Sequence, residues 1–216
     1  MLIEIGAEAT ELVVEGSGDR LVVLAHGAGA NMDGKLLLRL RDTLLQHGLV
    51  VARFNFLYKQ QGKSIPDRMP KLMETYSAVV KHLRQELNPQ TLVCGGHSMG
   101  GRTASMLAAE GFPMDGLLMF AYPLHPAGKP DKLRDEHLPK IEVPALCLNG
   151  TQDELCTKEL MDQVLPRLCR TWTMHWIEQA DHSLHVPKSS GTNDKQVLSD
   201  IGATVEAWIG TLSRAG

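Results

Sequence analysis

Ser98 lies in the segment CGGHSMGGRT, residues 94–103, where glycines flank the serine on both sides. Glycine accepts positive φ and lets other backbone approach closely, so this segment predicts a tight turn. The apolar run PQTLVCG before the turn indicates a strand, and GGRTASMLAAEG after it indicates a helix. Between strand and helix, the pattern G-x-S-x-G at residues 96–100 is typical of a turn that presents a nucleophilic serine. A glycine-rich turn without chemistry is the alternative interpretation.

A serine hydroxyl becomes a nucleophile when a histidine takes its proton and a carboxylate orients that histidine. In the corresponding strand-turn-helix proteins the acid and then the histidine follow the serine along the chain. Asp153 follows the apolar run PALCLNG, and His182 follows the alternating run TWTMHWIE. We therefore expect Ser98, Asp153 and His182 to form a catalytic triad, each in a loop after its own strand.

Other residues near these positions could take the same roles. Glu154 could replace the acid, although the shorter aspartate before it suits a tight turn. Asp181 adjoins His182 in the sequence, so we expect its side chain to point elsewhere. His185 is the main alternative base, and His97 is expected to pack beside the serine turn. An aspartate in a turn often binds only backbone, and a loop histidine is often merely solvated.

Backbone N–H groups must also stabilise the oxyanion that forms when a serine attacks a carbonyl. One donor normally belongs to the residue after the nucleophile, which here is Met99. The other should come from the loop after the first buried strand, RLVVLA, whose continuation is HGAGAN. We assign the N–H groups of Ala28 and Met99 to this oxyanion hole, although the glycines of HGAGAN could equally serve a plain turn.

The elements that must position these groups alternate between strands and helices. LIEI and ELVVEG indicate an opening antiparallel pair, and later strands are separated by helices such as the long one over residues 68–87. The segment FNFLYKQQGKSIPD is expected to be a loop, and residues 195–216 a closing amphipathic helix. This order predicts an α/β fold, a single domain over residues 1–216 with a mainly parallel sheet and helices on both faces. Active groups belong at the carboxyl ends of its strands.

The composition argues against several other functional classes of protein. A formal net charge of −3 spread along the chain provides no basic face, so we expect neither nucleic acid nor membrane as a partner, but a small-molecule substrate. The acidic start MLIEIGAEATELVVEG predicts no signal peptide. No apolar run is long enough to span a bilayer, and together these two observations favour a cytoplasmic protein. The cysteines lack C-x-x-C spacing and no metal-ligand cluster is visible, so disulfides, metals and cofactors are not expected. Oligomeric state is left open.

The motifs HGAGAN, GHSMGG, NGTQDE and ADHSL together resemble the α/β-hydrolase superfamily, nearly end to end. The small size is similar to its uncapped, dienelactone-hydrolase-like branch. More narrowly, RFNFLY, GHSMGGRTASMLA and YPLHPAGKPDKLRDEHL resemble a family of predicted hydrolases that has bacterial members and includes an animal testis-expressed protein and a chromatin-complex subunit. The resemblance implies the α/β-hydrolase fold and carries little information about the substrate.

These observations predict a serine hydrolase, a carboxylesterase or thioesterase acting on small substrates through an acyl-enzyme. The connection from Pro123 to Glu142 is too short for a large cap domain, which favours small soluble substrates. Its Lys129, Lys132 and Arg134 are interpreted as a solvated basic face rather than a site for acidic substrates. Peptidase, acyltransferase and perhydrolase chemistry use the same residues, and a binding or scaffold protein with an inactive triad is the alternative of a different class.

Overall fold

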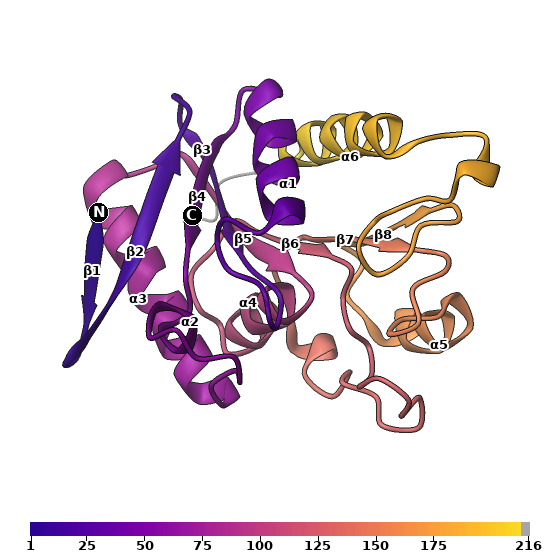
Figure 1. Cartoon of the computed structure of the whole chain (residues 1–216), viewed down its shortest axis with the longest axis horizontal. Coiled ribbons are helices and arrows are strands. Elements are labelled where there is room, and N and C mark those ends of the chain that lie inside the picture. Colours follow the sequence, from indigo (N-terminus) through magenta and orange to yellow (C-terminus); the bar gives the residue numbers. More distant parts are fainter. Residues whose placement is uncertain (213–216) are drawn as a thin grey trace.

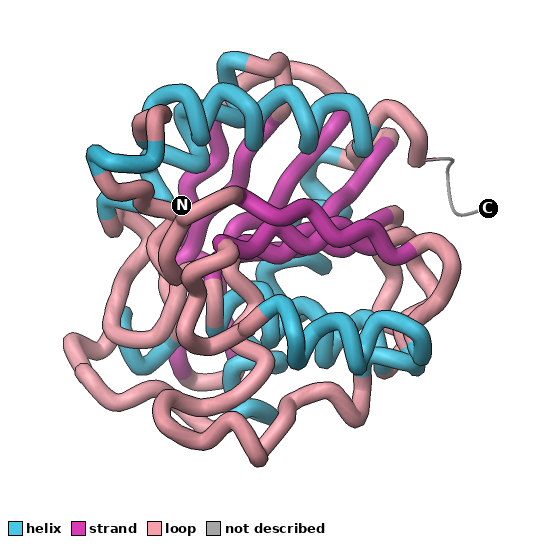
Figure 2. The backbone as a smooth tube through the Cα atoms, turned by 90° about the vertical axis from the view of Figure 1, so that its right-hand side faces the viewer, coloured by secondary structure: helices cyan, strands magenta, loops and turns pink. Residues whose placement is uncertain are grey.

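The computed structural model describes residues 1–212, whose strands form one eight-stranded sheet with helices above and below it (Figures 1 and 2). The strand order is β1-β2-β4-β3-β5-β6-β7-β8. The two pairings at the β1 edge are antiparallel and the other five are parallel, which confirms the expected mainly parallel sheet. The strands are β1 (Leu2–Ile5), β2 (Glu8–Glu15), β3 (Arg20–Ala25), β4 (Val50–Phe54), β5 (Thr91–His97), β6 (Gly116–Phe120), β7 (Ala145–Gly150) and β8 (Trp172–Ile177).

The central strands are buried because helices cover both sides of the sheet. All residues of β4, β6 and β7 are buried, whereas β8 at the edge is mostly half-buried. Parallel sheets show this pattern because their crossover helices shield both faces from water. The result is two apolar layers, one on each face of the sheet.

Each layer is closed by its own helices. One apolar layer includes side chains of α1 and α6, which pack against each other. The opposite layer includes side chains of α3, α4 and α5. The helices are α1 (Lys35–Gln46), α2 (Leu57–Gln60), α3 (Met69–Leu87), α4 (Met99–Ala109), α5 (Lys158–Val164) and α6 (Asp194–Ile209), with short 3₁₀ turns at η1 (Leu138–Lys140), η2 (Leu165–Arg167) and η3 (Lys188–Ser190).

Two local expectations need correction. The segment FNFLYKQQGKSIPD is not entirely a loop, because it contains the one-turn helix α2, whose Leu57 and Tyr58 are buried. So short a helix has too little periodicity to be recognised in a sequence. The closing helix, expected over residues 195–216, ends at Ile209 and is followed by a turn. Residues 213–216 of that expected helix lie outside the described residues.

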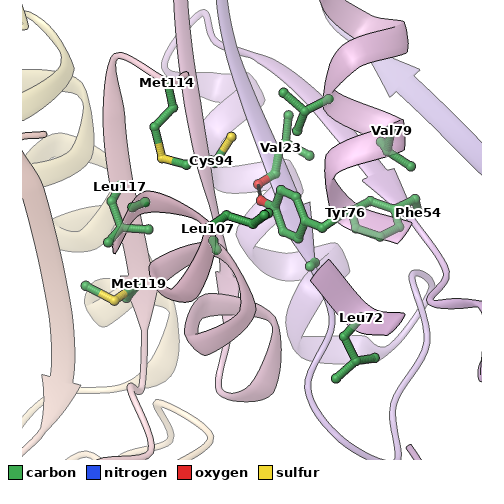
Figure 3. Close-up of a cluster of buried hydrophobic side chains, with 14 of the residues drawn as sticks. Val23, Phe54, Leu72, Tyr76, Val79, Cys94, Leu107, Met114, Leu117 and Met119 are labelled. Carbon is green, nitrogen blue, oxygen red and sulfur yellow. Dashed lines mark hydrogen bonds between the residues drawn. The ribbon is translucent and has the colours of Figure 1, made fainter. Parts of the chain in front are cut away.

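A buried tyrosine of α3 fastens this helix to the middle of the sheet. The hydroxyl of Tyr76 lies 2.9 Å from the carbonyl oxygen of Val23 on β3 and 2.8 Å from that of Gly95 on β5. It also accepts the N–H of Gly95, at 2.7 Å. Figure 3 shows the Tyr76 ring directed toward these strands, with Phe54 beside it; the two rings meet edge to face with centroids 5.2 Å apart. Tyr76 therefore supports β5 three residues before Ser98.

Tyr76→Phe should lower the free energy of unfolding by about 1–3 kcal/mol, because it leaves the buried N–H of Gly95 without this acceptor. The substitution retains the aromatic ring and its contact with Phe54, so the change isolates the hydroxyl. Urea denaturation followed by circular dichroism measures the difference. Equal midpoints for the two proteins would show that the hydroxyl contributes nothing.

Candidate active site

Ser98 occupies a strained turn between a strand and a helix. It is the single residue between the end of β5 at His97 and the start of α4 at Met99, and its backbone has φ 50° and ψ −114°. Positive φ is uncommon for a residue with a side chain and persists only where the surroundings hold it. Here the N–H of Ser98 donates to the carbonyl oxygen of Phe120 at 2.9 Å, and its own carbonyl accepts the N–H of Arg102 at 2.9 Å.

Two glycines allow this turn to sit directly against the end of β3. A Cβ atom at either Gly96 or Gly100 would collide with the carbonyl oxygen of Ala25. Gly96 also has φ +154°, a conformation that side chains rarely adopt. The glycines of the G-x-S-x-G pattern are thus required by close packing of backbone on backbone.

The structure brings Ser98, His182 and Asp153 into one line of hydrogen bonds. Nε2 of His182 lies 2.9 Å from Oγ of Ser98, and Nδ1 lies 2.9 Å from both carboxylate oxygens of Asp153. Ser98 and Asp153 are buried, with 9% and 1% of their surfaces exposed. Because Nδ1 faces a carboxylate, it carries the ring proton and leaves Nε2 to accept the serine proton.

These side chains meet because β5, β7 and β8 run parallel and end at the same edge of the sheet. The loops that follow β7 and β8 are joined by a hydrogen bond of 2.9 Å from the N–H of Gln152 to the carbonyl of Ala180. A Cβ atom at Gly150 would collide with that same carbonyl. The carboxylate loop can therefore lie directly on the histidine loop.

Asp153 is held by two further donors. The backbone N–H of Leu155 donates to Oδ1 at 2.8 Å, and Nδ2 of Asn149 donates to Oδ2 at 3.1 Å. Asn149 is fully buried, and its Oδ1 accepts the N–H of Tyr122 at 3.0 Å. Sequence reasoning gave Asn149 no role; the available signal was a polar residue at the end of the apolar strand PALCLNG.

The alternative acids and bases are placed elsewhere. Glu154 is exposed. Oδ1 of Asp181 accepts the N–H groups of Ser183 and His185, at 2.7 and 3.0 Å, and so shapes the loop. The ring of His185 is exposed and contacts the carboxylate of Asp194 at 2.9 Å. None of these three side chains replaces Asp153 or His182 in the hydrogen-bonded line.

His97, which was expected to pack beside the serine turn, and His26, which the sequence did not single out, hold the surrounding loops. Nε2 of His97 lies 2.9 Å from the carbonyl oxygen of His182 and donates to it. Nδ1 of His26 donates to the carbonyl of Gly27 at 2.9 Å, and its Nε2 accepts the N–H of Phe56 at 3.2 Å. Desolvation lowers the pKa of both His26 and His97 to about 4, so both rings are neutral near pH 7.

The two expected oxyanion donors border the same cavity as the serine. Ala28 lies in a turn closed by the N–H of Ala30 donating to Gly27, at 3.2 Å. Met99 is the first residue of α4, where backbone N–H groups have no partner within the helix. Ala28, Ser98 and Met99 all line a cavity of about 360 Å³. Both residues therefore border the space in front of the Ser98 hydroxyl.

Within residues 1–212, no three histidine, cysteine or acidic side chains are grouped so that they could hold a metal ion. The four cysteines are free thiols. Over the same residues, no helix has the length and apolar character needed to cross a membrane.

The comparison with known proteins identifies the family. A family model described as an alpha/beta hydrolase domain matches residues 18–210. The chain belongs to the alpha/beta hydrolase family. This membership and the observed sheet confirm the expected α/β-hydrolase fold.

Several solved structures superpose along nearly the whole chain. Est1E from Butyrivibrio proteoclasticus with ferulic acid bound has a TM-score of 0.79 at 16% identity, covering 98% of this chain and 100% of its own. Dienelactone hydrolase from Anabaena variabilis has a TM-score of 0.75 at 19% identity, covering 99% and 97%. A serine hydrolase without a lid from Xanthomonas campestris has a TM-score of 0.75 at 18% identity, covering 100% and 95%. At these identities the similarity establishes the shared fold.

The buried, neutral His26 should make this hydrolase sensitive to acid. Its pKa is about 4 in the folded chain and about 6.5 when unfolded, so its stabilising contribution is complete above pH 6.5 and is lost as the pH falls toward 4. Removing the ring should therefore reduce the loss of unfolding free energy between pH 7.5 and 4.5 by about 2–3 kcal/mol. Denaturation of His26→Gln at the two pH values measures this difference.

His82→Gln is the matched control, because His82 lies half-buried on α3, away from the active-site loops. It should keep the pH dependence of the parent protein. Burial also lowers the pKa of His97, so part of the acid sensitivity should remain in His26→Gln. An unchanged pH dependence in His26→Gln would contradict the assignment of a neutral ring at this position.

Proposed function

We propose that this alpha/beta hydrolase is a serine hydrolase that cleaves small esters or thioesters through an acyl-enzyme. The observation that carries the proposal is the hydrogen-bonded line from Asp153 through His182 to Ser98, because Ser98 lines an open cavity. Nucleophile, base and orienting acid each have a partner at 2.9 Å. The names of the fold relatives, a dienelactone hydrolase and a serine hydrolase without a lid, support the same class of reaction.

In the first half-reaction Oγ of Ser98 attacks the substrate carbonyl carbon while Nε2 of His182 takes the serine proton. The N–H groups of Ala28 and Met99 stabilise the oxyanion of the tetrahedral intermediate. Asp153 stabilises the imidazolium without taking its proton. When the intermediate collapses, His182 gives the proton to the leaving alcohol or thiol, and the acyl group stays on Ser98.

In the second half-reaction water replaces the leaving group. His182 removes a proton from the water, which attacks the acyl carbon, and the proton then returns to Oγ of Ser98 as the acid is released. The balance is one ester and one water consumed, and one acid and one alcohol or thiol formed.

The surroundings of the serine favour small substrates. The connection between β6 and β7 contains only the three-residue turn η1 as a helical element, so it provides no large lid. The cavity of about 360 Å³ lies at the small end of ligand sites in proteins. We further propose a single catalytic domain acting in the cytoplasm, related through RFNFLY and YPLHPAGKPDKLRDEHL to the small predicted hydrolases that include an animal testis-expressed protein and a chromatin-complex subunit.

Ser98→Ala should abolish both labelling by a fluorophosphonate probe and turnover of 4-nitrophenyl esters from acetate to octanoate, because it removes the hydroxyl that lies against Nε2 of His182. Ser183→Ala is the control, since Ser183 is exposed in the histidine loop and should leave both signals unchanged. Labelling retained in folded Ser98→Ala would refute the nucleophile. A parent protein that neither labels nor turns over any ester would favour a binding or scaffold role.

Asp153→Asn should lower kcat about 10³–10⁴-fold with little change in KM, because the amide no longer fixes the Nδ1–H tautomer or stabilises the imidazolium. Steady-state kinetics on the best 4-nitrophenyl ester measures the effect. Glu154→Gln, at the exposed neighbouring position, should keep the parent kcat. A comparable loss in the Glu154 variant together with an active Asp153→Asn would reverse the assignment of the acid.

A further inference from the structure

Two arginines enter the cavity that contains the serine. Arg102 lies one turn after Ser98 on α4, where its N–H donates to the serine carbonyl at 2.9 Å. Arg134 comes from the connection between β6 and β7. Both side chains line the same cavity as Ser98 and Met99, and both residues are partly withdrawn from solvent.

Neither guanidinium is neutralised within residues 1–212. No carboxylate there forms an ion pair with Arg102 or Arg134, and Nε of Arg102 is buried with no hydrogen-bond acceptor. Burial and then the positive charge of Arg102 lower the pKa of Arg134. Two like charges that line one cavity and form no ion pair with a described carboxylate are costly, so the arrangement favours an external anion.

The neighbouring titratable groups do not remove this positive charge. Asp67 also lines the cavity but forms no ion pair with either arginine; its Oδ2 accepts the backbone N–H of Tyr58 at 3.1 Å. Asp135 is paired with Arg167. Burial and the charge of Arg102 lower the pKa of His137 to about 4, so this ring is neutral near pH 7 and lies 2.8 Å from Oγ of Ser105.

We propose that Arg102 and Arg134 form a subsite for a second, anionic group of the substrate, a carboxylate or a phosphate. The inference rests on the proposed function, because it gives the substrate of the Ser98 reaction its chemical class: an ester or thioester that carries a negative charge away from the scissile bond. Guanidinium groups suit this role because their planar N–H pairs match carboxylate and phosphate oxygens. Lys129 and Lys132 of the same connection are exposed and do not line the cavity. Arg134 lines it, so it does not belong to the solvated basic face that was expected to include all three residues.

Kinetics with charge-matched esters tests the subsite. On the acyl side, the 4-nitrophenyl monoesters of glutarate, adipate and pimelate are compared with uncharged 4-nitrophenyl esters of equal carbon number. On the alcohol side, 4-acetoxybenzoate is compared with 4-acetoxybenzamide. The parent protein should prefer the charged member on one side by about tenfold to a hundredfold in kcat/KM, the range expected for hydrogen bonds to a charged group.

Arg102→Gln and Arg134→Gln should each reduce this charged-to-uncharged ratio toward one. Lys132→Gln, in the same connection but outside the cavity, is the matched control and should keep the ratio. A parent protein that shows no preference on either side, or a preference that survives both arginine substitutions, would overturn the subsite.

A binding measurement keeps the subsite testable even if no ester is turned over. In Ser98→Ala, NMR titration of the arginine Nε–Hε signals with glutarate and with inorganic phosphate should shift those of Arg102 and Arg134, whereas uncharged glutaramide should not. Comparison of the two anions shows whether carboxylate or phosphate is preferred. Absence of shifts with both anions would refute the subsite. Failure of the parent protein to react with the fluorophosphonate probe would instead contradict the serine mechanism and leave the subsite unaffected.

Discussion

The contact between the serine turn and the end of β3 is the constraint on which the site depends. Gly96 and Gly100 place their backbone against the carbonyl of Ala25, and this leaves Ser98 in a conformation with positive φ. The strain is sustained because β5 and α4 are both fixed on the sheet, β5 partly through the hydroxyl of Tyr76. A looser turn would relax the serine and move its hydroxyl away from the sheet edge.

The order and direction of the strands position the rest of the site. Because β5, β7 and β8 end at one edge, three short loops suffice to bring a hydroxyl, a carboxylate and an imidazole together. Asn149 and the N–H of Leu155 orient the carboxylate, and His97 fixes the backbone of the histidine loop. Neutral buried histidines serve here as scaffold, since a protonated ring would lose an accepting nitrogen or face a desolvation cost.

The charges around the cavity add a second level of organisation. The proposed catalytic groups could react with many carbonyl compounds, so selection between substrates must come from the residues that line the cavity. Arg102 lies on the same helix as Met99, the proposed oxyanion donor, so the helix connects the proposed anion subsite rigidly to the proposed reaction centre. Arg134 reaches the cavity from the connection between β6 and β7, and loops tolerate change better than the sheet does.

The sequence by itself determined the alternation of strands and helices, the glycines around the serine, and the chain order of Ser98, Asp153 and His182. These features depend on the local propensities of short segments, which can be recognised without knowing the tertiary structure. It did not reveal α2, whose single turn has no usable period, nor the supporting contacts of Asn149, His26 and Tyr76. Only the tertiary structure decided which residues face the serine. It separated Arg134 from Lys129 and Lys132 and joined it to Arg102, since the meeting of segments distant in sequence depends on how the connections pack over the sheet.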